Sequence, residues 1–113
     1  KIVERIRKET GAVVLFATTT PILDDRAAQT RRDREYELLD TSIRQYNAIA
    51  KKVMQQLEVP VNDLYSALSV SGSPLTVKDL IGGDGVHLQP EARVLLGKAV
   101  ATFVSRNLPS NQP

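Results

Sequence analysis

The chain has 113 residues, of which 42% are apolar and 25% charged, an ordinary globular composition for one small domain. Its net charge is only +2, and acidic and basic residues are interleaved, as in Arg31-Arg32-Asp33-Arg34-Glu35. This interleaving indicates a solvated surface, and no basic stripe carries aromatic residues that would stack on bases, so nucleic-acid binding is not expected. The absence of cysteine excludes disulfide bonds and thiolate chemistry.

Membrane and targeting segments are not expected either. No apolar run approaches the ~20 residues that a membrane-spanning helix needs, and the sequence has no recognisable signal peptide. The chain starts at Lys1 rather than at methionine and enters a helical pattern at once. We therefore expect a piece of a longer protein or a processed product, and the sequence leaves its compartment open.

The first predicted elements are a helix and a strand. Residues 1–10 have the pattern of an amphipathic helix, and Gly11 is placed to end it. Residues 12–17 form an apolar run that is too short for a helix and is typical of a strand buried on both faces of a parallel sheet. Ligands bind at the carboxyl ends of such strands, so residues 18–22 are candidates for lining a site. A continuation of the strand and turn is the simpler role for their hydroxyl groups.

The middle of the chain is predicted to hold a long loop and a long helix. Residues 24–34 are charged and poorly periodic, which indicates either a binding loop or lid or, more simply, a solvated loop. Between about residues 36 and 57, apolar residues recur at helical spacing and predict one inner face: Leu39, Ile43, Tyr46, Ala50, Val53 and Leu57. Asp40 or Thr41 is the expected N-cap if this helix starts late. Asn47 is expected to hydrogen-bond to a neighbouring loop.

A second strand is predicted at residues 59–65. It would place Asp63 near the carboxyl end of that strand, on the same side as Thr18. Asp63 is then either a site carboxylate or, more simply, the cap of the following turn. Residues 66–83 have an irregular pattern, with a flexible loop at 69–74 and one helical turn at 76–80.

The clearest helix is predicted at residues 90–106, with Pro90 at its first position, and residues 109–113 form a polar tail. Strands and helices therefore alternate, which predicts an α/β fold with a parallel sheet in one domain at 1–108. Two short strands cannot cover three amphipathic helices. We expect further strands to come from a missing upstream segment or from another copy of the chain.

The residues that point to chemistry are Asp84 and His87, the only histidine, on a glycine-containing loop before Pro90. The pKa of an imidazole is ordinarily about 6.5, and an imidazole is the usual general base for a serine hydroxyl. Such a base needs an acceptor on its other nitrogen, which an aspartate three residues earlier is placed to supply. A purely structural Asp–His pair is the alternative. With one histidine and no cysteine, neither a metal site nor a cofactor is predicted.

The segment Asp84-Gly85-Val86-His87-Leu88-Gln89-Pro90 resembles the last motif block of the SGNH hydrolases, the GDSL family of lipases and esterases. That block is an Asp-x-x-His motif that leads into the C-terminal helix. The likeness extends back through the chain. Residues 13–21 look like the family's late buried strand, which ends in a Thr-Pro step, and residues 46–50 and 59–65 are similar to its penultimate helix and last strand.

The resemblance implies a three-layer α/β/α, flavodoxin-like SGNH-hydrolase fold, of which this chain is an incomplete C-terminal portion. It also implies hydrolysis of an ester or O-acyl group on a lipid, carbohydrate or small molecule through an acyl-serine intermediate. His87 would be the general base and then the general acid, and Asp84 would orient it.

The family's nucleophile and oxyanion blocks are not found in this sequence. It contains no Gly-Asp-Ser block, no Gly-x-Asn-Asp block and no Gly-x-Ser-x-Gly elbow. No serine is expected to act as the nucleophile, whether Ser42, Ser66, Ser69, Ser71, Ser73, Ser105 or Ser110. We therefore expect the chain alone to be essentially inactive on esters.

Two other interpretations remain open. The chain is alternatively a non-catalytic α/β interaction module, or a pseudo-hydrolase subunit, whose exposed sheet edge pairs with a partner. A ligand-binding flavodoxin-like domain ranks last, because no glycine-rich phosphate loop follows the strand at residues 12–17.

Overall fold

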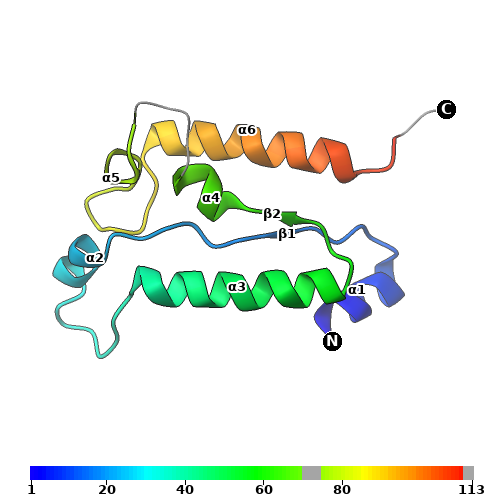
Figure 1. Ribbon diagram of the computed structural model, residues 1–113, viewed down its shortest axis with the longest axis horizontal. Helices are drawn as coiled ribbons and strands as arrows, with labels where there is room; N and C mark the ends of the chain where they lie inside the picture. The colour runs from blue at the N-terminus through cyan, green and yellow to red at the C-terminus, as the bar shows by residue number, and fades with distance from the viewer. Residues whose placement is uncertain (70–74, 111–113) are drawn as a thin grey trace.

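The computed structural model describes residues 1–69 and 75–110 and shows a mixed α/β chain that is mostly helical (Figure 1). The elements follow the order α1 (Ile2–Thr10), β1 (Phe16–Ala17), α2 (Asp24–Thr30), α3 (Asp40–Gln56), β2 (Val61–Asn62), α4 (Leu64–Ser69), α5 (Val77–Leu80) and α6 (Pro90–Asn107). Of the loop predicted at 69–74, only Ser69 is described, and it ends α4. The rest of that loop, like residues 111–113, lies outside the described residues.

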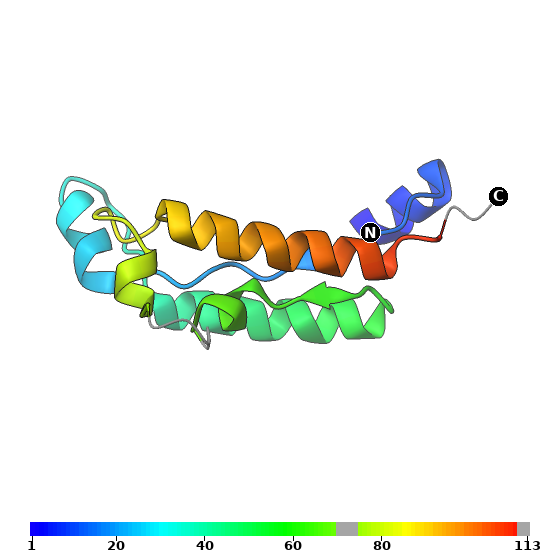
Figure 2. The same ribbon diagram turned by 90° about the horizontal axis from the view of Figure 1, so that it is seen from above.

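Strands β1 and β2 pair in parallel, with Phe16 opposite Val61 and Ala17 opposite Asn62. The two long helices, α3 and α6, lie on opposite sides of this pair and run along the long axis of the molecule (Figures 1 and 2). Helix α1 is at one end of the molecule and α2 at the other. The predicted α/β class with a parallel sheet is thus confirmed at this coarse level.

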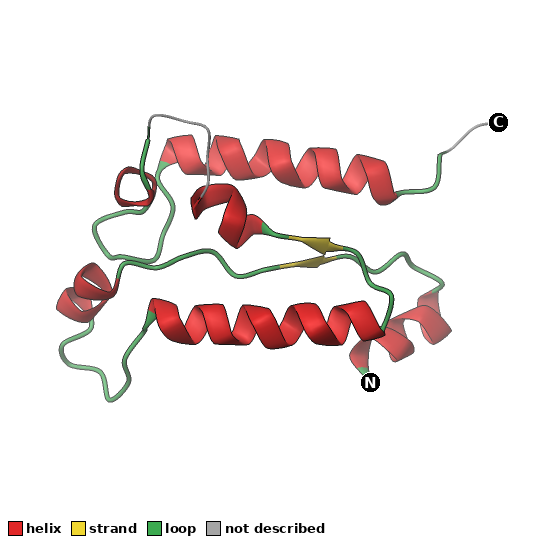
Figure 3. Ribbon diagram, viewed as in Figure 1, coloured by secondary structure: helices red, strands yellow, loops and turns green. Residues whose placement is uncertain are grey.

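The sheet is small and has only two strands (Figure 3). Among the described residues, no further strand pairs with the outer edge of β1 or with that of β2. The molecule measures 51 × 33 × 20 Å, and its radius of gyration of 16.4 Å exceeds the roughly 13–14 Å of a compact domain of this size. The chain therefore spreads along its two long helices rather than closing around one central core.

The prediction of a doubly buried strand at residues 12–17 is wrong in part. Only Phe16 and Ala17 are strand, Val13 is 50% exposed and Ala17 is exposed. A strand is covered on both faces only when neighbouring strands hold the helices over it, and here a single partner strand of two residues pairs with β1. The apolar run identified the strand correctly but not its surroundings.

The best-packed region lies between α6 and the short helices α4 and α5. Its buried side chains are Leu68, Leu80, Ala92 and Leu96, with Leu64, Leu88 and Leu95 packed around them. Pro90 begins α6, as predicted, because proline lacks the N–H that would have no partner at that position. This cluster anchors the amino-terminal half of α6 and the loop that precedes it.

Helix α3 starts at Asp40, later than residue 36, and its inner face differs from the predicted one. Asn47 is the buried residue of the helix: its side chain accepts from the Thr19 N–H (2.9 Å) and donates to the Thr19 carbonyl (2.8 Å), as expected for a bond to a neighbouring loop. This bond turns Asn47 toward the chain after β1. Tyr46 and Ile49 consequently point outward and are 70% and 62% exposed.

The N-cap of α3 is Leu39 rather than Asp40 or Thr41. Instead of capping its own helix, Asp40 accepts hydrogen bonds from the Ile22 N–H (3.2 Å) and the Tyr65 hydroxyl (2.7 Å). The carboxylate of Asp24 accepts the Asp40 N–H at 2.7 Å and satisfies the start of the helix from outside. Burial and the bond to Asp40 raise the pKa of Tyr65 to about 12.

The prediction of a loop at residues 24–34 is wrong in part, because residues 24–30 form α2 and only residues 31–34 lie outside a helix or strand. A helix of seven residues is too short to show a clear apolar period, and only Ala27 in it is buried. Asp24 and Asp25 lie in its first turn, where acidic side chains interact favourably with the helix dipole. The segment packs against residues 81–85, which lie far away in the sequence.

The strand predicted at 59–65 ends at Asn62, and helix α4 follows it directly. Asp63 sits between them and caps α4, since its Oδ1 accepts the Ser66 N–H at 3.2 Å. The helical turn predicted at 76–80 is confirmed as α5. Asp79 there accepts hydrogen bonds from the N–H and the hydroxyl of Thr76, both at 2.8 Å.

Asp63 is also the centre of a polar cluster that joins β1, α3 and α4. It accepts the Thr18 hydroxyl at 3.0 Å, the Ser66 hydroxyl at 2.9 Å and the ammonium group of Lys51. Burial raises the pKa of the Asp63 carboxyl, but the hydrogen bonds from Lys51, Ser66 and Thr18 outweigh it and lower the pKa to about 2. The charged form of Asp63 is therefore the form that the fold stabilises.

Acid is expected to destabilise the fold through Asp63. Its folded-state pKa of about 2 is below the ordinary 3.8, so the stabilisation is full above about pH 4 and is lost as pH falls through 2. Because the side chain is 32% exposed, screening limits this to roughly 1–2 kcal/mol. Asp63→Asn should lower the urea midpoint at pH 6 and flatten its fall between pH 4 and 2. Asp33→Asn controls for loss of one charge, and an unchanged acid decline in Asp63→Asn would contradict this assignment.

Candidate active site

The candidate site is the loop between α5 and α6, which is closed at its base by backbone hydrogen bonds. Ile81 and Leu88 form an antiparallel bridge, the Gly82 N–H donates to the His87 carbonyl (2.7 Å), and the Gln89 N–H donates to the Leu80 carbonyl (2.9 Å). Ile81 is only 1% exposed. The loop is thus a hairpin-like turn at residues 81–88, called the His87 turn below. Its base is buried beside α6, and its tip carries polar side chains.

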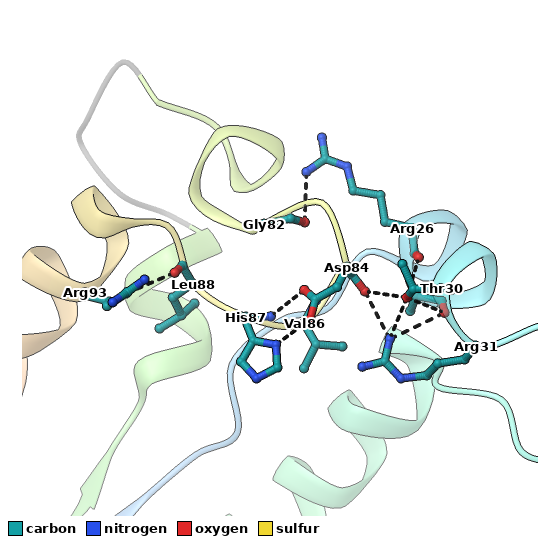
Figure 4. A network of polar contacts seen from close by, with 10 residues as sticks. Arg26, Thr30, Arg31, Gly82, Asp84, Val86, His87, Leu88 and Arg93 are labelled. Carbon is teal, nitrogen blue, oxygen red and sulfur yellow. Dashed lines mark hydrogen bonds and ion pairs between the residues drawn. The ribbon is translucent and has the colours of Figure 1, made fainter. Parts of the chain in front are cut away.

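Asp84 and His87 lie together at the tip of this turn, and Figure 4 shows their side chains facing each other. Oδ1 of Asp84 accepts the N–H groups of Val86 (3.0 Å) and His87 (2.9 Å). Oδ2 of the same carboxylate bonds to Nδ1 of the His87 ring. One carboxylate therefore shapes the backbone of the turn and also orients the imidazole that the turn carries.

The electrostatics of the pair favour a carboxylate and a defined imidazole tautomer. The hydrogen bond from His87, together with the two backbone donors, holds the pKa of Asp84 well below its ordinary value. A carboxylate accepts only, so a neutral His87 ring must carry its proton on Nδ1, which leaves the lone pair on Nε2. Within residues 1–69 and 75–110, Nε2 has no hydrogen-bond partner.

Nε2 of His87 is open to solvent. The His87 side chain is 83% exposed, whereas that of Asp84 is 32% exposed. In Figure 4 the far edge of the ring points away from Asp84. A surface hollow at this place is lined by Val86, His87, Leu88 and Arg93. Arg93 is held there by its Nε–H, which donates to the Leu88 carbonyl at 3.2 Å. The arrangement can accept a proton from a group placed in the hollow.

The other candidate residues lie apart from this pair. Thr18 is buried and donates to Asp63, and the backbone of Thr19 is bound by Asn47, so this part of residues 18–22 has a structural role. Asp63 belongs to the Lys51 cluster rather than to the His87 turn. None of the described serines bonds to His87: Ser66 and Ser69 donate to Asp63 and to the Tyr65 carbonyl.

No group of three or more histidine, aspartate or glutamate side chains that could hold a metal ion occurs in the described part of the chain. In the same residues, no helix has the length and apolar character needed to cross a bilayer.

Three residues that no sequence pattern singled out contact the turn from its other side; two of them lie in α2, and the third, Arg31, is its C-cap. Arg26, Thr30 and Arg31 all donate to backbone carbonyls of residues 78–84 (Figure 4). They are more than fifty positions away from their acceptors, and interleaved charges ordinarily indicate a solvated surface. No local pattern could have paired them with the turn.

Comparison with known proteins does not place the chain in a family. No model of a known protein family matches it, and no curated protein matches it.

Proposed function

We propose that this chain is the C-terminal portion of an SGNH-type serine esterase or acylhydrolase, and that its fold extends to the three-layer α/β/α architecture of that family. The observation that carries the proposal is the Asp84–His87 pair. It sits on a backbone-closed turn directly before α6, with Nδ1 bound and Nε2 exposed. This is the arrangement that a histidine general base requires.

The proposed reaction starts with a serine hydroxyl that comes from a segment outside this sequence. Nε2 of neutral His87 takes the hydroxyl proton while Oγ attacks the carbonyl carbon of an ester or O-acyl group. The imidazolium then returns the proton to the departing alcohol as the tetrahedral intermediate collapses to the acyl-serine. Water repeats the sequence, releases the acid and restores the serine. Asp84 stays ionised throughout, since its pKa is far below the range in which an imidazole titrates.

The unpaired edges of the sheet support the proposal of a larger α/β domain. The second edge of β1 has no partner among the described residues, and Val13, three residues before β1, is half exposed. Tyr46, Ile49 and Val53 are exposed on α3 at positions that recur every three or four residues. A neighbouring strand and the chain around it would cover these groups, and the serine and oxyanion donors would come from that portion.

The same open edge favours a second candidate, the non-catalytic interaction module or pseudo-hydrolase subunit. In that case a partner strand pairs with β1, and the Asp84–His87 bond only shapes the turn. The two candidates differ in whether the protein that contains this chain has a serine that His87 activates.

Labelling with a fluorophosphonate separates the candidates, because this reagent phosphonylates serines that a histidine base has activated. The natural gene product that contains this chain should be labelled, and peptide mapping should place the modified serine outside residues 1–113. His87→Ala should abolish labelling. Gln89→Ala, a change two positions away in a side chain that makes no cap hydrogen bond, should not.

Each outcome decides between the candidates. Labelling that requires His87 supports the hydrolase. A modified serine inside residues 1–113 would contradict the assignment of the nucleophile to another segment. A folded gene product that stays unlabelled would overturn the hydrolase and leave the interaction module.

A further inference from the structure

The contact between α2 and the His87 turn consists of a set of donors aimed at backbone oxygens. Nη1 of Arg26 donates to the carbonyls of Ile81 (2.8 Å), Lys78 (3.0 Å) and Gly82 (3.4 Å). Lys78 lies in α5, and Ile81 is its C-cap. A guanidinium group here neutralises the partial negative charge at the end of that helix. Through these hydrogen bonds, Arg26 holds the first residues of the turn, Ile81 and Gly82, against α2.

A second arginine holds the carbonyl of Asp84 itself. Nη1 of Arg31 donates to the Asp84 oxygen at 3.1 Å. The Thr30 hydroxyl also lies 3.3 Å from this oxygen, but it shares its one hydrogen with the Arg26 carbonyl at 3.1 Å. Nη1 of Arg31 also donates to the Thr30 hydroxyl at 3.0 Å, so the two donors support each other. Figure 4 shows them on the side of Asp84 that faces away from His87.

The third contact is direct packing of the turn on α2. The Leu23 N–H donates to the Gly85 carbonyl at 2.9 Å. Gly85 has φ +77, and a Cβ atom there would lie 2.5 Å from the Ala27 nitrogen. The backbone of the turn therefore touches the backbone of α2, with room for neither a side chain nor a water molecule between them.

From these contacts we infer that α2 is the positioning element of the Asp84–His87 pair, with Arg26 and Arg31 as positioning residues that act through the backbone of residues 81–85. The inference rests on the proposed hydrolase for its functional meaning. Since Oδ1 of Asp84 binds the turn and Oδ2 binds the ring, a rotation of the Asp84 peptide moves both oxygens. Donors on the Asp84 carbonyl prevent that rotation, and their loss releases Nδ1.

The tautomer of His87 tests this without any assay of activity. In the ¹⁵N-labelled natural gene product, at a pH at which the His87 ring is neutral, long-range ¹H–¹⁵N spectra report which nitrogen of that ring carries the proton. The unmodified protein should show mainly the Nδ1–H form. Arg31→Met should reduce that form severalfold and move the Asp84 carboxyl titration, followed by ¹³C shifts, up toward its ordinary range. Arg31→Lys, which keeps a cationic donor, should restore part of both.

Arg32→Met is the matched control, because Arg32 is the adjacent exposed arginine and donates no hydrogen bond to the turn. It should leave the tautomer unchanged. If Arg31→Met disturbs packing more widely, the amide shifts of α3 and the far end of α6 will move with those of the turn, and Arg31→Lys will not restore the tautomer. That result would overturn a positioning role in favour of a general structural one.

The fluorophosphonate rate of the natural gene product separates this inference from the proposed function. Arg31→Met should slow labelling about 10- to 100-fold, as small misplacements of a catalytic group do. If Arg31→Met changes neither the rate of labelling nor the tautomer of His87, the positioning role is overturned and the proposed hydrolase function is unaffected. A tautomer that responds to Arg31 in a protein that is never labelled would support the positioning role and overturn the hydrolase. A wild-type ring without the Nδ1–H form would overturn the positioning role directly.

Discussion

Replacing Gly85 by alanine is expected to lower the free energy of unfolding by roughly 2–4 kcal/mol, since it combines backbone strain with overpacking. The residue has φ +77, which is unfavourable for a side chain. Its added Cβ would lie 2.5 Å from the Ala27 nitrogen and 2.6 Å from the Leu23 carbonyl oxygen, and both are backbone atoms. The turn cannot move away from α2 without breaking the hydrogen bond from the Leu23 N–H to the Gly85 carbonyl. Urea denaturation measures the loss.

Gly83→Ala is the matched control for this change. Gly83 lies two positions earlier in the same turn, and a Cβ atom there would have no neighbour within 4 Å. The two variants introduce the same methyl group into the same loop. Equal urea midpoints for Gly83→Ala and Gly85→Ala would show that α2 does not press against the turn as described.

Asp84→Asn should reduce the rate of ester hydrolysis by the natural gene product about 10³- to 10⁴-fold, the effect of removing the orienting carboxylate from a histidine base. The amide keeps an oxygen that accepts from the Val86 and His87 N–H groups, so the turn should persist. Its NH₂ group then faces Nδ1 and can only donate. The neutral ring must carry its proton on Nε2, the wrong nitrogen for accepting the serine proton.

A chromogenic acetate ester measures this effect, which should appear in kcat with little change in KM. Asp79→Asn is the matched control: Asp79 is an exposed aspartate of the preceding helical turn, where it bonds to Thr76 rather than to the histidine. A loss in Asp79→Asn as large as that in Asp84→Asn would point to general damage. Full activity of Asp84→Asn would remove Asp84 from the proposed mechanism.

Much of the local structure could be predicted from the sequence, because it depends on residues that lie close together along the chain. Gly11 ends α1 in the left-handed conformation with φ 65, and Pro90 begins α6, as expected of these residue types. The Asp84–His87 bond joins residues only three positions apart, so spacing alone was enough to predict it. Asn47 was likewise expected to bind a loop, and it does.

Predictions that depended on what covers an element were less accurate. The apolar run at residues 12–17 and the predicted inner face of α3 have the composition of buried faces, yet Val13 is 50% exposed and Tyr46 is 70% exposed. Burial is a property of the surroundings of a residue, and β1 has only one short strand beside it. Helix α2 was missed for the related reason that its stability comes from contacts with residues 81–85 rather than from a period of its own.

The sequence by itself thus determined the α/β class, the long helices and the pairing of one acid with one imidazole, since each depends on composition and on spacing within a few residues. Only the tertiary structure decided how that pair is held. Arg26 and Arg31 meet carbonyl oxygens more than fifty positions away, and Gly85 packs against the start of α2. Backbone oxygens are the same at every position, so no residue pattern marks which of them an arginine will bind. That choice is made when the packing of α4, α5 and α6 brings the turn against α2.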